Sequence, residues 1–151
     1  MPPDNYSDDR LPTGEWNGYY LESHRPRRGW MHLYLNFRDG VISGEGTDYV
    51  GPWHIRGSYD LRNHQCSWVK QYLGKHQVDY HGTIGNEGIM GNWFIASFTG
   101  EFHIWPRSMG YLNELYLQND LEMGIDNPVP SMKLGTVPWD PIPAEALQDQ
   151  V

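Results

Sequence analysis

The side chains with the clearest chemical potential lie in the stretch "CSWVKQYLGKHQVDYHG", residues 66–82. It contains two alternating segments around a tight turn, so every second residue shares a face. That face carries Trp68, Lys70, Tyr72, His76, Val78 and Tyr80. An ammonium enclosed among aromatic rings is costly unless an anion or a hydrogen-bond acceptor compensates it. The stretch therefore predicts either a polar site for an anionic or aromatic ligand, or a buried ion pair.

Period-two alternation, interrupted by turn signals, continues far beyond this stretch and predicts eight strands. They cover residues 14–22, 30–37, 41–48, 53–60, 65–72, 76–83, 87–95 and 99–106. Short connections make the strands consecutive antiparallel hairpins, and eight are enough to close a barrel. Frequent glycines within the strands favour a strongly coiled barrel over the alternative, an open two-sheet sandwich. The expected fold class is an all-β, eight-stranded antiparallel up-and-down barrel.

The register brings further polar groups to one end of this barrel. The third strand is ambiguous, and the interpretation that points Ile42, Gly44, Gly46 and Asp48 inward is preferred. Tyr20, Asp48, Lys70, Tyr72 and His76 then meet beneath one mouth, with Trp53, Trp68 and Tyr80 as deeper walls. The basic loop 23–29 is expected to cover that mouth. Such a combination of apolar walls and few polar groups is typical of ligand pockets.

The barrel is expected to span residues 14–107, between an N-terminal tail 1–13 and a C-terminal tail 108–151. Leu112, Leu115 and Tyr116 follow a helical step and favour a short helix packed outside the barrel. The proline-rich remainder, which contains Trp139, is expected to be extended. It could wrap the barrel or a second subunit and so support a homo-oligomer, with disorder as the alternative.

Composition limits the partners and the cellular location. The net charge of −8 argues against nucleic acid, and no apolar run is long enough for a bilayer. The N-terminal residues lack the pattern of a signal peptide, so the expected location is cytoplasmic. The single cysteine, Cys66, excludes an intrachain disulfide and is expected to be a core residue. Histidine spacing gives no metal site, and no nucleotide or cofactor motif occurs, so none is expected.

Gly14-Glu15-Trp16 at the start of the first strand resembles the Gly-x-Trp of the calycins, the barrels of lipocalins and avidins. In many calycins a basic residue after the last strand stacks on that tryptophan, and Arg107 has the corresponding position. The resemblance covers residues 14–107 and implies a closed barrel that binds a small molecule. Residues that contact ligand in that family cannot be matched here one by one.

Three functions remain open from the sequence. The first is a small-molecule-binding barrel that uses the polar cluster at the mouth. The second is a small barrel enzyme, such as an isomerase, cyclase or hydrolase. In it His76 or Asp48 would act as general acid or base, and Lys70 and Tyr72 would stabilise negative charge. The third is a protein-interaction module with a solid core. A packed interior would favour the third, and an open pocket would favour the first two.

Overall fold

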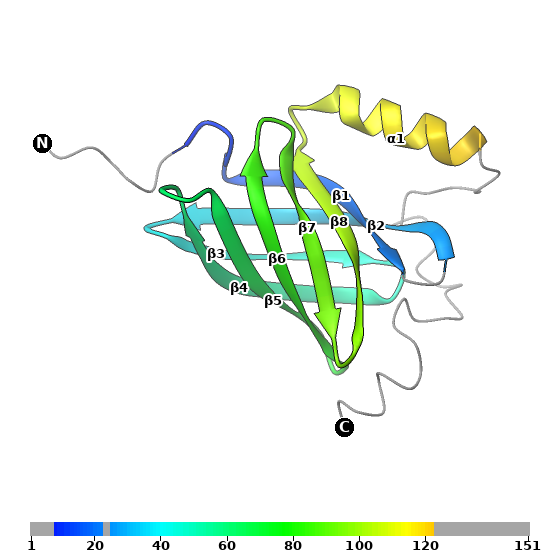
Figure 1. Ribbon diagram of the computed structural model, residues 1–151, viewed down its shortest axis with the longest axis horizontal. Helices are drawn as coiled ribbons and strands as arrows, with labels where there is room; N and C mark the ends of the chain where they lie inside the picture. Colours follow the sequence, from blue (N-terminus) through cyan, green and yellow to red (C-terminus); the bar gives the residue numbers. More distant parts are fainter. Residues whose placement is uncertain (1–7, 23–24, 123–151) are drawn as a thin grey trace, which may run out of the picture.

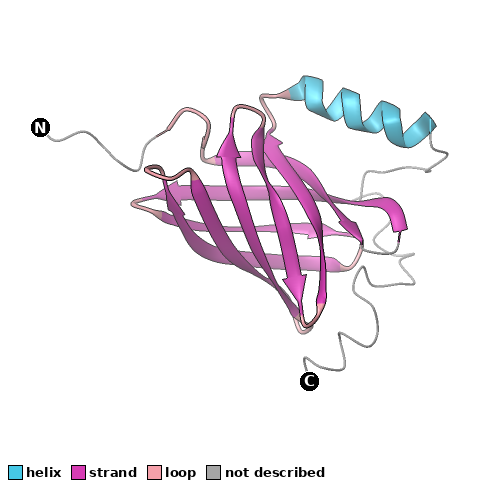
Figure 2. Ribbon diagram, in the orientation of Figure 1, coloured by secondary structure: helices cyan, strands magenta, loops and turns pink. Residues whose placement is uncertain are grey.

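The computed structural model of the chain describes residues 8–22 and 25–122, the side chains of 25–27 and 117–122 excepted. Eight antiparallel strands follow one another around a closed barrel, in the order β1 to β8 (Figures 1 and 2). They are β1 Gly14–Glu22, β2 Arg25–Arg38, β3 Val41–Asp48, β4 Gly51–Asp60, β5 Gln65–Tyr72, β6 Gln77–Gly85, β7 Gly88–Ile95 and β8 Phe98–Pro106. The predicted all-β, up-and-down barrel is confirmed. A helix, α1 Gly110–Glu122, follows the last strand.

The barrel has two different ends. The connections β1–β2, β3–β4, β5–β6 and β7–β8 lie at one end, which we call the mouth end, and β1 begins at the other, the closed end. The predicted strand limits differ from the observed ones by at most two residues, except at β2. There the expected loop 23–29 is wrong from residue 25 onward, because Arg25 and Arg28 pair with Glu22 and Leu21 across an irregular register.

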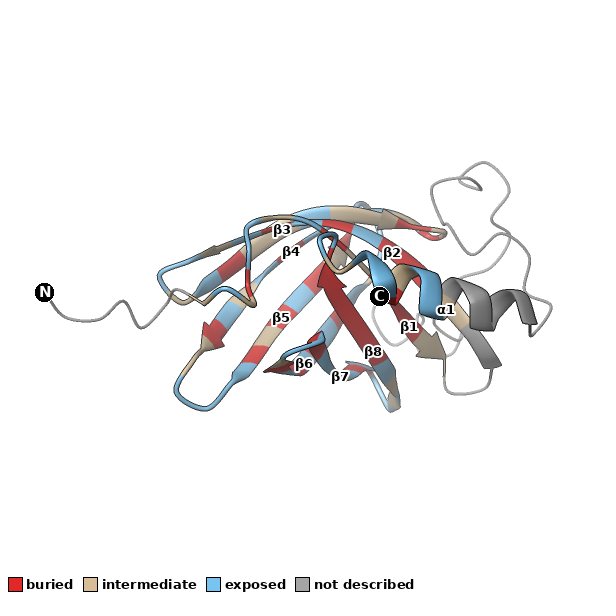
Figure 3. Cartoon of the chain, turned by 90° about the horizontal axis from the view of Figure 1, so that it is seen from above, coloured by how far each residue is buried: buried red, intermediate tan, exposed pale blue. Residues whose placement is uncertain are grey.

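Inward positions alternate along the strands as the sequence predicts (Figure 3). Ile42 and Asp48 are both fully buried, which confirms the preferred register of the third strand. The β2–β3 turn has positive φ at Asp39 (51°) and Gly40 (79°). A two-residue hairpin turn needs these values to match the right-handed twist of its strands. At Gly57 and Gly91 the neighbouring strand lies so near that an added Cβ would meet a backbone oxygen at 1.9 Å. These glycines therefore permit the close approach of coiled strands.

The segment that precedes β1 covers the closed end. The calycin resemblance instead implied that Arg107 would stack on Trp16 there. Leu11 joins the buried core, and the Trp16 indole N–H donates to the Pro12 carbonyl at 2.8 Å. The Arg107 backbone N–H donates to the Glu15 carbonyl, and this pairing places the two side chains together. The Arg107 guanidinium is 64% exposed and pairs with the Glu15 carboxylate rather than covering Trp16.

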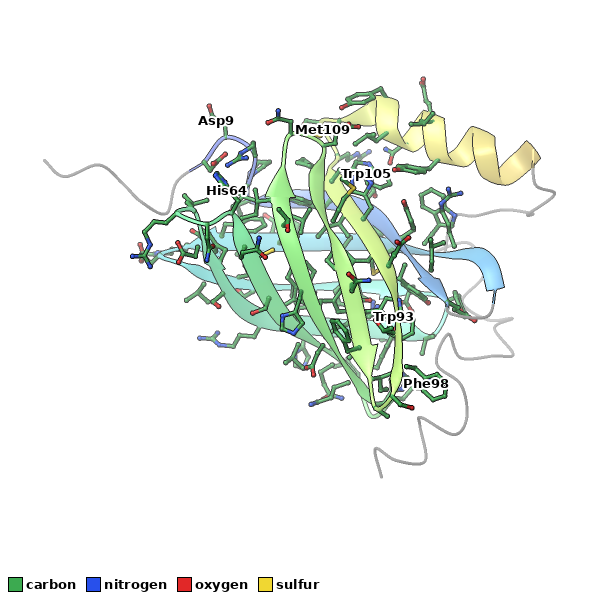
Figure 4. All side chains as sticks on the ribbon, in the orientation of Figure 1. Asp9, His64, Trp93, Phe98, Trp105 and Met109 are labelled. Atoms are coloured by element: carbon green, nitrogen blue, oxygen red, sulfur yellow. The ribbon has the colours of Figure 1, made fainter. Side chains whose placement is uncertain are left out.

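Helix α1 covers a second, outer cluster of aromatic residues on β1, β2 and β8 (Figure 4). Its members are Tyr19, Trp30, Trp105 and Leu112, with Leu21, Met109 and Tyr116 packed against them. Tyr116 stacks on Trp105 at a centroid distance of 5.2 Å, and the Arg28 guanidinium lies 4.9 Å from the Tyr116 ring. A helix lies where the sequence favoured a short one, and Leu112 is buried, but Leu115 is 51% exposed and does not pack against the barrel as predicted. The proline-rich tail with Trp139 lies outside the described residues.

His103 lies on the outer face of β8, and the packing of α1 buries it. Its Nδ1 lies 3.0 Å from the Tyr116 hydroxyl on the helix, and its Nε2 bonds to the Glu87 carbonyl. Burial lowers the pKa of His103 below its ordinary value. Within the described residues, no helix has the length and hydropathy required to cross a membrane.

We expect acid to loosen the packing of α1. Because the folded pKa of His103 is lowered, its contribution to stability is complete above about pH 6.5 and is lost as the pH falls through the folded value. Denaturation at pH 7.5 and pH 5 should show a decrease on the order of 1 kcal/mol. His103→Gln should reduce that decrease, whereas replacement of the exposed His81 by Gln should not. Equal pH dependence in both variants would contradict the assignment.

Candidate functional site

The carboxylate of Asp48 is the centre of a polar network inside the barrel at the mouth end. Its Oδ2 accepts hydrogen bonds from Lys70 Nζ at 2.8 Å, the Tyr72 hydroxyl at 2.7 Å and Trp53 Nε1 at 3.1 Å. Its Oδ1 accepts the Val50 backbone N–H at 3.0 Å. Four donors thus satisfy one carboxylate that is completely buried.

The Lys70 ammonium is enclosed on all sides by this network and by aromatic rings. Besides Asp48, it lies 3.3 Å from the Tyr80 hydroxyl and 3.5 Å from the Met31 sulfur, so each of its three N–H groups has a partner. Four ring centroids lie within 5.5 Å of Nζ, those of Tyr20, Trp53, Tyr72 and Tyr80. The cation is therefore stabilised by its carboxylate and by the ring faces together.

The electrostatics hold Lys70 in its charged form. Burial by itself would lower the pKa of the ammonium, but the Asp48 carboxylate outweighs burial and the pKa is raised. The pair carries no net charge, and both side chains are at most 2% exposed. A water-sized void beside them would expose their atoms, so the space around the pair is filled by protein. In this arrangement neither group has a free hydrogen-bonding position to offer a substrate.

The mouth above the network is covered by side chains from the β3–β4 and β5–β6 connections and from the end of β1. The Tyr49 hydroxyl donates to Glu22 Oε1 at 2.8 Å and so joins the β3–β4 turn to the end of β1. The His76 ring lies 4.8 Å from the Tyr72 ring, and Lys75 Nζ donates to the Val50 carbonyl. Beneath them lies the hydroxyl of Tyr20.

The Tyr20 hydroxyl is the exception in an otherwise satisfied site. Its side chain is 2% exposed, and it makes no hydrogen bond of acceptable geometry to any residue that the structure describes. Burial, and then the nearby Asp48 carboxylate, raise the pKa of this hydroxyl well above its usual value. It is therefore a neutral donor that faces the network, with the Tyr49 side chain beside it.

The structure brings together all the residues that the sequence assigned to the mouth. Tyr20, Asp48, Trp53, Lys70, Tyr72 and Tyr80 are buried around one point, and His76 is half-buried at the rim. Trp68 lies deeper, stacked on Tyr80 at a centroid distance of 5.5 Å. Cys66 is a core residue: its thiol bonds to the Gly82 carbonyl, and burial raises its pKa to about 12. Among the described residues, no group of three or more His, Cys, Asp or Glu side chains could hold a metal ion.

A groove of about 490 Å³ lies on the outer face of β2, β3 and β4, near the mouth end. We call it the outer groove; its lining includes His32, Tyr34, Glu45, Pro52, His54 and Leu73. Tyr34 is 49% exposed and Leu73 is 56% exposed, so the groove presents apolar surface to solvent. A second groove, of about 620 Å³, lies at the closed end and is lined mostly by polar side chains, including Asp39, Asp60 and His81.

Sequence reasoning missed the outer groove and the contact between Tyr49 and Glu22. Alternation correctly places His32 and Tyr34 outside, but it gives no information about whether an outer surface is concave. The Tyr49 contact joins residues 27 apart across the mouth, and only the closed barrel brings them together. Comparison with known proteins gives no match for this chain among family models, curated proteins or solved structures.

Removal of Lys70 alone should destabilise the protein strongly. Lys70→Met leaves the Asp48 carboxylate buried without its counter-ion, which typically costs about 3–5 kcal/mol. The double variant Asp48→Asn, Lys70→Met removes both charges and should recover a substantial part of that loss. Urea denaturation of the two variants measures the difference. If Lys70→Met were as stable as the parent chain, the pair would not have the structural role assigned to it.

Proposed function

We propose that the protein is a binding module with a packed interior, and that it recognises an extended, proline-rich peptide on its outer groove. The observation that carries this proposal is the exposed apolar lining of a groove of about 490 Å³. Pockets of this size accept small ligands and anchoring side chains. Tyr34 offers an aromatic face and Leu73 an aliphatic side chain, and both are about half exposed. Pro52 adds a third apolar side chain to the lining.

The chemistry of the lining favours a peptide in the polyproline II conformation. Such peptides dock in aromatic-lined grooves, and their preformed backbone loses little entropy on binding. The polar residues His32, Glu45 and His54 stand along the groove and can supply hydrogen bonds to peptide carbonyl and amide groups. The enclosure of Asp48 and Lys70 supports binding over catalysis, since their hydrogen-bonding positions are already occupied.

A titration with a defined peptide tests this proposal. Acetyl-PPWPPP-amide should bind the full chain, and acetyl-SSWSSS-amide, which lacks the preformed backbone, should bind more weakly. Tyr34→Ala should reduce the affinity by about tenfold or more, as removal of an aromatic anchor does. Tyr111→Ala removes an equally exposed tyrosine from α1 and is the matched control. Amide NMR chemical shifts report where the peptide binds. The proposal would be overturned if the peptide changed no shifts in β2–β4, or if it changed them equally in Tyr34→Ala.

A small molecule at the mouth is the second candidate, favoured by the Tyr20 hydroxyl. This donor is buried beside aromatic walls and makes no hydrogen bond of acceptable geometry among the described residues. Because protein fills the space around Asp48 and Lys70, such a ligand would have to displace side chains at the mouth to lie beside Tyr20, Tyr72 and His76. Because Asp48 already neutralises Lys70, a neutral carbonyl acceptor suits the site better than an anion.

Benzamide and benzoate distinguish these two ligand chemistries. Benzamide should shift the Trp53 indole N–H resonance, and benzoate should shift it less. Tyr20→Phe removes the donor and should abolish the benzamide effect while the fold is retained, because the lost hydroxyl makes no bond among the described residues. Tyr34→Phe is the control on the outer face. An unperturbed Trp53 resonance at saturating benzamide would exclude this candidate.

A further inference from the structure

The proposed groove has an occupant available within the same chain. We infer that residues 137–143, "VPWDPIP", bind the outer groove of their own barrel and compete there with external peptides. This inference rests on the proposed function, because it assigns the groove the same class of ligand. The segment contains three prolines and one tryptophan within seven residues, a composition that favours polyproline II recognition with an aromatic anchor.

The geometry of β2 and α1 supports binding in cis. The outward residues of β2 follow the order Arg28, Trp30, His32, Tyr34. Arg28 and Trp30 lie beneath α1, and His32 and Tyr34 line the outer groove. Successive outward residues of a strand are about 7 Å apart, so the groove begins beside the surface that α1 covers.

Helix α1 runs toward the mouth end of the barrel, where the outer groove lies. The helix starts after β8 at the closed end, and by Tyr116 it has reached Arg28, near the mouth end of β2 (Figure 1). The outer groove also lies toward the mouth end, where Pro52 and Leu73 border it. The 14 residues from 123 to 136 span up to about 46 Å when extended, as much as the whole of β2. The chain is therefore long enough to place residue 139 against Tyr34.

Hydrogen-bonding groups and tethering add to this complementarity. Asp140 follows the tryptophan, and His32 and His54 in the groove can donate hydrogen bonds to its carboxylate. A connection of 14 residues tethers the segment to α1, and tethers this short give effective concentrations on the order of millimolar. Even a segment with weak affinity in trans would then occupy the groove in a large share of molecules. An external peptide has to displace it, so its apparent affinity is reduced by the occupied fraction.

The affinity of acetyl-PPWPPP-amide for full-length variants tests the competition. Trp139→Ala removes the internal anchor and should raise the apparent affinity severalfold. Leu147→Ala, which changes an apolar residue of the same tail outside the segment, should leave it unchanged. If the peptide binds the parent chain and Trp139→Ala equally, and Tyr34→Ala still weakens it, the outer groove is a peptide site and the inference is wrong.

A direct contact measurement is independent of any added peptide. Nuclear Overhauser effects between the Trp139 indole and the Tyr34 ring are expected in the parent chain, at intensities that do not change on dilution. Their absence overturns the inference. Contact between two copies of the chain is tested by mixing chains with different isotope labels. If the effects occur only between differently labelled chains, the tail of a second copy occupies the groove. That result also overturns binding in cis. Failure of the peptide to bind either protein, with these effects present, would instead contradict the proposed function.

Discussion

The contact between Asp48 and Lys70 is the constraint on which the organisation of the barrel depends. Asp48 ends β3 and Lys70 lies on β5, and their partners come from β1, β2, β4 and β6. An ammonium cannot remain charged in such an interior without a carboxylate at hydrogen-bond distance. A slip of β3 by one residue would point Asp48 outward and leave that ammonium unpaired. The pair therefore selects one register for several strands together.

Neutralisation of these charges also determines where recognition can occur. The two ions cancel, and the surrounding rings leave them almost no accessible surface. A pocket for a charged ligand needs a charge that is not already compensated, and this interior has none to spare at the network. What the barrel leaves open is its outside, where Tyr34 and Leu73 keep about half of their surface exposed. This distribution is the physical reason for placing peptide binding on the outer face.

Periodicity predicted the interior well because the side-chain period of a strand is two. It placed Asp48, Lys70 and Tyr72 on the inner face of one end, and the structure confirms that placement. Features that depend on other parts of the chain could not be predicted in the same way. His103 is outward by alternation, and only the packing of α1 shows that it is buried. Arg107 has the position of a closing residue, yet the pairing of β8 with β1 directs it to Glu15.

The same argument explains why a groove and its proposed occupant are difficult to recognise from a pattern. Concavity of an outer face depends on how strongly neighbouring strands coil, and the coil depends on close contacts such as those of Gly57 and Gly91. A proline-rich segment, by contrast, has a conformation that its composition already favours. It needs only a complementary surface within reach of its linker. The contact of Tyr116 on α1 with Arg28, and the exposed Tyr34 farther along β2, meet that condition in one chain.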